Sequence, residues 1–557
     1  MDLSTGSKLP LIKQMWRELR WMLGYAKGYR GVIVLTLALG AVSVLFGLGS
    51  SLASKYLLDS VIGRNPGSLA VFAAAMGACM LASVAVRAVS SRVSGVAGVK
   101  LKQKVRSDVF RRIMVSRWEP LHEKKSGDLL ARVLSDSSAV SGTVLSFVPS
   151  VGAAGIQFTG AFVLLLIYDP VMALIALLCA PVSVLFSRLW MRRMRRSDDL
   201  LRKTDGEISA YCSEALAGID TVKSFGIYRL FVRGLDKLHS RYFSCYEGYN
   251  RLTVTASAAM SVMGILVYAA CFAWGVYRLW TDPEIYTYGT FTLFLGLASS
   301  LRGSFSSLVS AVPSLISATA GAGRIMEIFD LDTEPDPHEM TESTYGVRAE
   351  GVCFSYDGRR RVLDGFSLTA DPGEAIAVTG SSGSGKTTLM RLMLGLADFE
   401  GRIVLVTPDG TEIPVSAATR RAFAYVPQGN TVFAGTVAEN LRMVKEDATD
   451  EEIVSALKKA CAYGFVSEMP GGINAVIGEK GAGISEGQAQ RIAIARALLC
   501  DAPVILLDEA TSALDSATER KIMDSIAAEG GRTCILSSHR GQVIESCTRT
   551  YRVGEPL

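Results

Sequence analysis

The stretch Ala375–Leu394, AIAVTGSSGSGKTTLMRLML, joins a short apolar run, a glycine-rich turn and the beginning of a helical pattern. Its turn has the spacing G-x-x-x-x-G-K-T, formed by Gly380, Gly385, Lys386 and Thr387. A strand before this motif and a helix after it are the context in which it binds phosphates. Backbone amides close around the phosphates, the lysine neutralises the β and γ groups, and the threonine hydroxyl can ligate magnesium. The stretch therefore predicts an α/β nucleotide-binding domain.

A second motif, Ala502–Asp515, reads APVILLDEATSALD and begins with an apolar strand. Two carboxylates, Asp508 and Glu509, end this strand. Asp508 can hold magnesium through the water shell of the ion, and Glu509 can polarise the attacking water as a general base. A buried strand whose carboxylates cap the next helix is the alternative, and the phosphate-binding turn upstream counts against it. Together the two motifs predict hydrolysis of ATP.

The composition is that of a membrane protein. The 557 residues are 49% hydrophobic and 20% charged, with a mean hydropathy of +0.29. Several apolar runs come near the roughly 20 residues that a helix needs to cross about 30 Å of hydrocarbon. These six runs are 31–54, 65–86, 147–168, 171–187, 252–277 and 285–323, and only Arg302 interrupts the last. Buried helices of a large soluble protein are the alternative, which so many runs of this length disfavour.

The charges between these runs indicate the topology. Segments 87–136 and 188–251 are rich in Lys and Arg, whereas the other connections are short and carry few cations. Because positive residues stay on the cytoplasmic side, we expect both termini and the ATPase domain in the cytoplasm, in a multi-pass protein of the cell membrane. The two long segments are helix-like and would extend about 35 Å beyond the membrane. Their midpoints, Ser116–Lys125 and Ser209–Ile219, are candidates for short transverse helices, with solvated turns as the alternative.

We therefore expect three parts: a six-helix transmembrane α domain with long cytoplasmic loops in residues 1–330, a linker in 331–344, and an α/β P-loop domain in 345–557. The linker is acidic, contains proline and has no apolar period. Beyond it, short strand-like runs alternate with helical ones, as in an α/β domain. The ten cysteines form no C-x-x-C pair, which argues against a disulfide framework or a zinc site.

In this order and spacing the motifs resemble the ATP-binding cassette (ABC) family, specifically its half-transporters of the exporter fold, called type IV. The resemblance covers essentially the whole chain and implies an ABC-type transport ATPase that uses ATP and Mg²⁺. It implies that Tyr356 stacks on adenine, that Gln428 contacts magnesium and the attacking water, and that His539 is a switch histidine near the γ-phosphate. The sequence SALD around Asp515 resembles the family's loop that crosses the dimer interface.

The resemblance sorts the candidate site residues into groups. The catalytic residues are Glu509, His539 and Gln428, and the magnesium ligands are Thr387, Gln428 and Asp508. The ATP-binding residues are Tyr356, Gly380, Ser381, Gly383, Ser384, Gly385, Lys386, Thr387, Thr388, Ser485, Gly487, Gln488 and Asp515. Two further stretches, Gly478–Gly481 and Ser126–Asp136, resemble family features that link the cassette to the first cytoplasmic loop.

The signature motif departs from the family pattern. In this family the helix that begins at LSGGQ closes over ATP held by a second cassette, and here the residues are Ile484–Gln488, ISEGQ. Ser485 is a natural N-cap, and its hydroxyl and the amide of Gly487 could meet a γ-phosphate. Glu486 would lie in the first helical turn, where a carboxylate interacts favourably with the helix dipole. A Glu486 that faced the phosphates would repel them and indicate a decayed site. We favour a functional variant because the catalytic carboxylate Glu509 is retained.

The resemblance implies an ATP-driven membrane transporter that acts as a dimer, because each ATP site needs two cassettes. A homodimer is the simplest assembly, and a heterodimer with a homologous half is the alternative. We expect an exporter or flippase of a lipid, peptide or amphipathic small molecule, and no nucleic acid partner. The alternatives are an importer of the siderophore type with this fold, an ATP-gated channel or regulatory subunit, and a soluble cassette ATPase, which the membrane spans disfavour.

Arg302 bears on the cargo. An arginine on a membrane helix costs a few kcal/mol on insertion scales, so it faces a cavity, a partner or the interface rather than lipid. Fourteen residues after Tyr288, it would lie about 21 Å deep, among Ser299, Ser300, Ser304 and Ser306. The hypothesis is that Arg302 lines the substrate cavity and favours cargo with a phosphate or carboxylate. An arginine that reaches inner headgroups or pairs with another helix is the alternative.

Overall fold

We analysed a computed structural model of the chain. It describes residues 11–554 except 123, 125, 283–285, 339–341, 343, 357, 359, 430, 479–480 and 529–530, and their side chains except at 11–12, 175–192, 260, 267, 305–306, 308–310, 313 and 542–543. The chain divides into two compact units, Met1–Ser116 with Glu123–Leu331, and Arg117–His122 with Asp332–Leu557.

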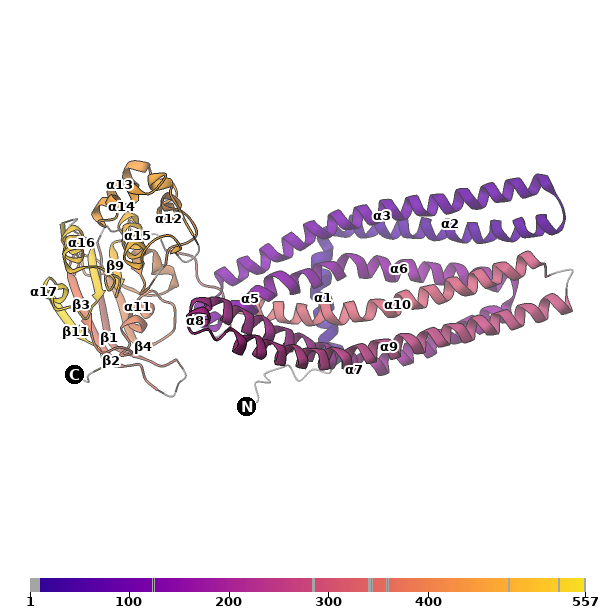
Figure 1. Cartoon of the computed structure of the whole chain (residues 1–557), viewed down its shortest axis with the longest axis horizontal. Helices are drawn as coiled ribbons and strands as arrows, with labels where there is room; N and C mark the ends of the chain where they lie inside the picture. The colour runs from indigo at the N-terminus through magenta and orange to yellow at the C-terminus, as the bar shows by residue number, and fades with distance from the viewer. Residues whose placement is uncertain are drawn as a thin grey trace. The chain divides into compact units, whose positions relative to one another are not determined.

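The first unit is a bundle of long helices that lie side by side (Figure 1). The long helices are α2 (Arg30–Ile62), α3 (Pro66–Val115), α6 (Ser137–Tyr168), α7 (Pro170–Ala217), α9 (Tyr228–Thr281) and α10 (Tyr288–Phe329). The shorter elements are α1 (Leu11–Ala26), η1 (Lys27–Tyr29), α5 (Ser126–Ala131), η2 (Arg132–Asp136) and α8 (Ile219–Ser224). Each long helix contains most or all of one apolar run found in the sequence.

Length and composition qualify four helical stretches of the described residues as membrane spans: Lys13–Ile62, Pro66–Val115, Ser126–Tyr168 and Tyr228–Thr281. The 54 residues of α9 would be about 80 Å long at 1.5 Å per residue, well over the thickness of the hydrocarbon layer. The long helices therefore extend beyond a membrane, as the sequence predicted.

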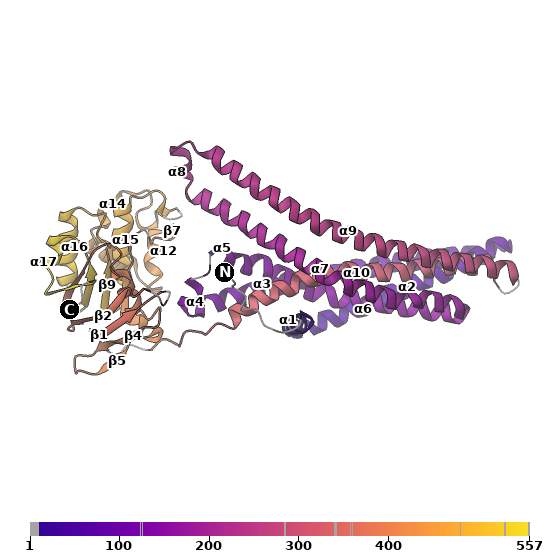
Figure 2. The ribbon, with the colours of Figure 1, turned by 90° about the horizontal axis from the view of Figure 1, so that it is seen from below.

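The second predicted transverse helix was misplaced. Residues 209–217 continue α7, and the short helix is α8, which joins α7 to α9 (Figure 2). The physical reason is that 209–217 contains neither glycine nor proline, so α7 continues to its C-cap at Gly218. The first prediction was closer, because the short helix α4 (Trp118–His122) lies within Ser116–Lys125.

A buried carboxylate holds one end of the bundle together. Asp169 is 1% exposed, and its Oδ1 accepts from the backbone N–H of Val171 at 2.9 Å, which caps α7. Its Oδ2 accepts from the Trp274 indole at 3.0 Å and from the Tyr286 hydroxyl at 3.1 Å, and lies 3.5 Å from Arg278 Nε. The connection between α6 and α7 is thereby fixed to α9 and to the segment that leads into α10.

The second unit combines an antiparallel and a parallel sheet. The antiparallel sheet has the order β2-β1-β4-β5, the parallel sheet β11-β3-β10-β9-β6, and β7 pairs with β8. The strands are β1 (Gly346–Phe354), β2 (Leu363–Ala370), β3 (Ala375–Thr379), β4 (Glu400–Val406), β5 (Glu412–Pro414), β6 (Phe423–Val426), β7 (Gly435–Thr436), β8 (Val476–Ile477), β9 (Val504–Asp508), β10 (Thr533–Ser537) and β11 (Arg549–Arg552).

Helices complete this unit and cover its sheets. They are α11 (Lys386–Met393), η3 (Ala417–Ala422), α12 (Val437–Arg442), α13 (Asp450–Lys459), α14 (Tyr463–Glu468), η4 (Gly472–Asn474), α15 (Glu486–Leu499), α16 (Ser516–Ala528) and α17 (Gly541–Glu545). One core lies between α11 and the two larger sheets, and a second lies between the parallel sheet and α12 to α16. The chain is thus a helical domain with candidate membrane spans joined to an α/β domain, as the sequence predicted.

In the helical unit, α2 and α10 approach closely at Gly289. Asp59 accepts from the backbone N–H of Gly289 and from the hydroxyl of Thr287, each at 3.0 Å. A Cβ at Gly289 would overlap the carbonyl oxygen of Lys55 and would lie 2.5 Å from Asp59 Oδ1. Only a glycine fits here without a shift of backbone.

We expect Gly289→Ala to lower the thermal unfolding midpoint of the purified protein in detergent, because overpacking of this kind costs about 1–3 kcal/mol. Gly303→Ala on the same helix is the matched control, since a Cβ there meets nothing within 4 Å. In the helix interior alanine is favoured over glycine, so the control should keep or raise the midpoint. Equal midpoints for the two variants would contradict the packing described at Gly289.

Candidate nucleotide site

The register of the parallel sheet brings the predicted motifs to one edge. Strand β10 pairs in parallel with β3 on one side and with β9 on the other. The carboxyl ends of parallel strands meet at the same edge of a sheet, where α/β proteins bind their ligands. The glycine-rich turn follows β3, Asp508 and Glu509 end β9, and His539 follows β10. Residues distant in the sequence are therefore neighbours here.

The glycine-rich turn before α11 has a backbone that its glycines make possible. The φ angles of Gly380, Gly383 and Gly385 are 151°, 80° and 109°, in the region that other residues avoid. A Cβ at Gly380 would lie 2.6 Å from Ser384 Oγ and 2.7 Å from the carbonyl oxygen of Val553. Ser384 Oγ is buried and has no hydrogen-bond partner among the described residues. A turn of this form ahead of a helix is suited to a phosphate group.

Lys386 lies inside this turn. Its side chain is 5% exposed, and Nζ donates to the carbonyl oxygens of Gly380 at 3.0 Å and Ser381 at 3.2 Å. The same Nζ lies 2.9 Å from His539 Nε2 and 3.5 Å from Glu509 Oε1. The ammonium group is therefore the centre around which the predicted residues gather.

Glu509 completes the cluster. Its Oε2 accepts from Gln428 Nε2 at 2.9 Å, and its Oε1 lies 3.2 Å from His539 Nε2. Its φ of 48° is unusual for a residue other than glycine, and its backbone N–H donates to Ser537 Oγ at 2.9 Å. The structure thus brings Lys386, Gln428, Glu509 and His539 together, with one carboxylate contacting the other three side chains.

Asp508 is fully buried and held from two sides. Its Oδ1 accepts from the Ser537 hydroxyl at 2.9 Å, and its Oδ2 accepts from the Tyr425 hydroxyl at 3.3 Å. Burial and the neighbouring Asp508 carboxylate raise the pKa of Tyr425, so the phenol keeps its proton and donates it to this bond. The Asp508 carboxylate and the Thr387 hydroxyl supply the hard oxygen atoms that Mg²⁺ prefers, so the residues present fit this ion.

Tyr356 lies beside α11. Its hydroxyl is 3.2 Å from Thr388 Oγ1 and accepts from Arg391 Nη1 at 3.4 Å. Its ring meets that of Phe354 edge to face, with centroids 4.8 Å apart. About half of the residue remains exposed, which leaves ring surface on which a base could stack.

The signature helix α15 begins with a capping box. The hydroxyl of Ser485 accepts from the backbone N–H of Gln488 at 3.3 Å, and Gln488 Oε1 accepts from the N–H of Ser485 at 2.8 Å. Glu486 is the first helical residue and is exposed, as predicted. A Cβ at Gly487 would lie 2.9 Å from the carbonyl oxygen of Ala513, so this glycine also allows α15 to approach the loop before α16.

Asp515 caps α16. Its Oδ1 accepts from the N–H groups of Thr518 at 2.9 Å and Ala517 at 3.1 Å. The hydrogen bond from the Thr518 backbone is the main reason why the pKa of Asp515 is lowered. Of the stretch Gly478–Gly481, residues 479 and 480 lie outside the described residues.

Sequence reasoning missed the residues that hold this site in place. Gln490 is buried on α15, donates to Ser512 Oγ at 3.2 Å and accepts from the Ala513 N–H at 3.1 Å. Arg540, next to the switch histidine, donates to the carbonyl oxygens of Ser512 at 2.9 Å and Leu514 at 2.7 Å. A glutamine inside the apolar stretch QRIAIARALL was the available signal for Gln490, because buried amides need partners.

Arg302 lies on α10 in the helical unit and is exposed. Its Cγ and Cδ would lie 2.7 and 2.8 Å from a Cβ at Gly264 on α9, so the aliphatic part of the side chain rests on that glycine. Among side chains that the structure describes, none forms a hydrogen bond or ion pair with Arg302. The side chain of Ser306, which we expected nearby, lies outside the described set.

Both units match known protein families. Residues 32–305 match the ABC transporter transmembrane region, and residues 363–512 match the ABC transporter family. A bacterial Atm1-family ABC exporter with ATP bound has the same fold, with a TM-score of 0.86, 23% identity and 95% of each chain covered.

Sequence relatives agree with this fold. An ATP-dependent lipid A-core flippase of Chromohalobacter salexigens is 32% identical over 460 residues, which are 80% of this chain and 77% of the relative. The flippase of the same name in Escherichia coli K12 is 29% identical over 88% of this chain and 85% of its own. The uncharacterised ABC transporter ATP-binding protein YfiC of Bacillus subtilis is 26% identical over 95% of this chain and 88% of its own. The chain therefore belongs to the ABC transporter family, as a half-transporter of the exporter fold that couples ATP hydrolysis to transport across a membrane.

Proposed function

We propose that this ABC transporter works as a dimer, most simply a homodimer, which uses ATP and Mg²⁺ to export or flip an amphipathic cargo with an anionic group. The use of ATP is supported by one observation: the side chains of Lys386, Gln428, Glu509 and His539 contact one another in a single cluster. The lipid A-core flippases among the relatives support the class of cargo. The distribution of cations in the sequence supports cytoplasmic termini.

In the proposed site these residues have binding and catalytic roles. Lys386 and the glycine-rich turn bind the phosphates, and Tyr356 stacks on adenine. Thr387, Gln428 and Asp508 would hold Mg²⁺, which would neutralise charge on the phosphate oxygens. Glu509 accepts the proton of the attacking water. His539, with its Nε2 3.2 Å from Glu509 Oε1, orients that carboxylate and faces the γ-phosphate.

The exposed start of the signature helix α15 supports a dimer. Ser485 and Glu486 are exposed at the start of α15, where the helix has its partial positive charge. A helix start of this kind can bind phosphate supplied by a second cassette, with Ser485, Gly487 and Gln488 nearest to it. Asp515 would lie at the same interface.

The anionic cargo is supported by Arg302. A guanidinium on an apolar helix without a described partner retains its five donors for a ligand. Phosphate and carboxylate groups match these donors with paired hydrogen bonds. The contact between the Arg302 stem and Gly264 fixes where the side chain leaves α10.

Glu509→Gln should lower ATP turnover by at least about 100-fold, in line with removal of a general base, while ATP binding remains. Turnover by the purified transporter and the affinity for a fluorescent ATP analogue measure the two effects. Glu451→Gln, an exposed change of the same kind on α13, is the control and should match the parent. Turnover of Glu509→Gln within threefold of the parent would reject the assignment.

Glu486→Gly should leave ATPase activity within a few-fold of the parent, because an exposed first-turn carboxylate contributes only about 0.3–1 kcal/mol to the helix. Ser485→Arg should abolish activity, since it removes the cap and places a large side chain at the phosphate-facing end. Both are measured as steady-state phosphate release. A tenfold gain on removal of Glu486 would instead show that this residue restrains the site.

Arg302→Ala should abolish the stimulation of ATPase activity by phosphate-bearing lipid in nanodiscs and leave basal hydrolysis nearly intact. Arg302→Lys keeps the charge but loses the paired geometry, so it should keep part of the stimulation. The comparison uses nanodiscs of phosphatidylcholine with and without lipid A. Unchanged stimulation in Arg302→Ala would reject the role of Arg302 and leave the ATPase assignment intact.

A further inference from the structure

One buried hydroxyl lies between the two carboxylate residues of the nucleotide site. Ser537 ends β10 and is 3% exposed, and its hydroxyl donates to Asp508 Oδ1 at 2.9 Å. The same oxygen accepts from the backbone N–H of Glu509 at 2.9 Å, and this N–H also faces the carbonyl oxygen of Ser537 at 3.3 Å. A hydroxyl has a single proton to donate, so the bond to Asp508 uses it. Ser537 therefore contacts both residues at once.

The contact of Ser537 with Glu509 is made through the backbone. The φ of Glu509 is 48°, a left-handed conformation that is unfavourable for a residue with a side chain and persists where neighbours hold it. In this conformation the Glu509 carboxylate accepts from Gln428 and lies beside Lys386 and His539. The Ser537 hydroxyl thus acts on the position of this carboxylate through the main chain.

A second hydroxyl, that of Tyr425, holds Asp508 alone. Tyr425 lies on β6, which pairs with β9 on the side opposite to β10. Its hydroxyl donates to Asp508 Oδ2 at 3.3 Å. Among the hydrogen bonds that the structure describes, none joins Tyr425 to Glu509. Asp508 is therefore held from both neighbouring strands, whereas the backbone of Glu509 is held from β10.

We propose that Ser537 is a positioning residue with two roles: it orients Asp508 toward Mg²⁺, and it holds the backbone from which Glu509 reaches the attacking water. Tyr425 has the first role only. Outer partners of a metal ligand orient that ligand, and their loss typically lowers metal affinity by about 10- to 100-fold. These roles rest on the proposed functions of Asp508 and Glu509, and under them the two hydroxyls are not equivalent.

Nucleotide affinity and turnover of the full chain in nanodiscs separate the two roles. The binding probe is a fluorescent ATP analogue, titrated in EDTA and again with Mg²⁺. In Tyr425→Phe and in Ser537→Ala the affinity in EDTA should stay that of the parent, whereas the affinity with Mg²⁺ should fall by about tenfold. At saturating Mg-ATP, Tyr425→Phe should regain the turnover of the parent. Ser537→Ala should stay about tenfold or more below it, because a displaced base remains displaced when the site is full.

Thr533→Val is the matched control for a loss that is only structural. Thr533 is fully buried on the same strand, and its hydroxyl donates to the carbonyl oxygen of Tyr345 at 2.6 Å and accepts from the N–H of Gly373 at 2.8 Å. Valine has nearly the shape of threonine but no hydroxyl, so the thermal midpoint should fall while the response to Mg²⁺ and the saturated turnover stay those of the parent. Ser537→Cys keeps nearly the size of serine, but its thiol is a weak donor and acceptor, so it should give the same result as Ser537→Ala.

Each role of Ser537 can be overturned separately. A parent-like response of Ser537→Ala and Ser537→Cys to Mg²⁺ would overturn the first role. Recovery of their turnover at saturation, as in Tyr425→Phe, would overturn the second. Equal losses in Thr533→Val would overturn both, because any hydroxyl lost from this sheet would then have the same effects. If the parent gained no affinity from Mg²⁺, or if Glu509→Gln kept the turnover of the parent, the proposed functions of Asp508 or Glu509 would fail first, and the corresponding role of Ser537 with them.

Discussion

The parallel pairing of β3, β10 and β9 is the constraint on which the nucleotide site depends. In this register Ser537 lies opposite Val378 on one side and Asp508 on the other. A shift by one residue would turn each of these side chains to the other face of the sheet. The Ser537 hydroxyl bonds to Asp508 and receives the N–H of Glu509, so the register and the carboxylates stabilise each other. The unusual backbone of Glu509 is held by the same contact.

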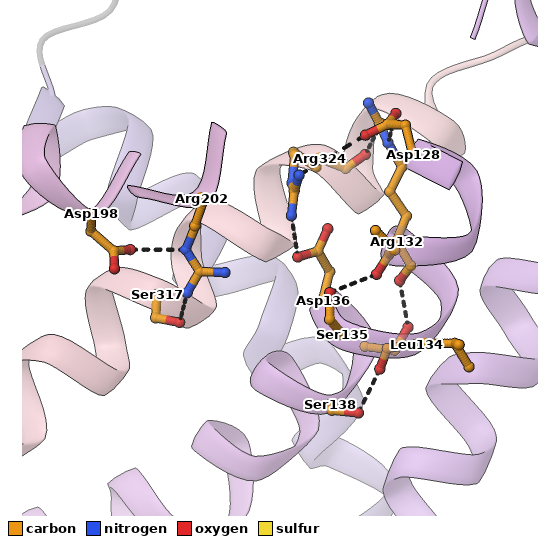
Figure 3. A network of polar contacts seen from close by, with 12 residues as sticks. Asp128, Arg132, Leu134, Ser135, Asp136, Ser138, Asp198, Arg202, Ser317 and Arg324 are labelled. Carbon is orange, nitrogen blue, oxygen red and sulfur yellow. Dashed lines mark hydrogen bonds and ion pairs between the residues drawn. The ribbon is translucent and has the colours of Figure 1, made fainter. Parts of the chain in front are cut away.

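Buried carboxylates in the two units are satisfied to different extents. In the nucleotide-binding unit a buried polar group such as Asp508 is satisfied on both oxygens, which suits a rigid site. In the helical unit Asp136 is paired with Arg324 on one oxygen alone among the described residues (Figure 3). Asp169, in the same unit, is satisfied on both oxygens, so the helical unit contains buried carboxylates of both kinds.

Much of this could be predicted from the sequence. Glycine-rich turns and carboxylates after apolar strands are local signals, and the structure places Lys386 and Glu509 together as their motifs suggest. The six apolar runs predicted the helical domain, because a span needs a minimum length of apolar residues to cross the membrane. The partners of Gln490 and Arg540 could not be predicted, since they lie in a loop that only the tertiary fold brings near. The short helix α8 was predicted too early in the chain, because the end of α7 depends on one capping residue, Gly218.

The loop of residues 512–514 accepts and donates hydrogen bonds to side chains from two different elements. Gln490 holds it from the signature helix, and Arg540 holds it from the segment that carries His539. In the proposed dimer the signature helix would meet the ATP bound by the partner, and the segment with His539 would meet the ATP bound by the chain itself. Both neighbours contact this one loop, so in the proposed dimer the loop would link the two ATP sites. The two sites of such a dimer would then not be independent of each other.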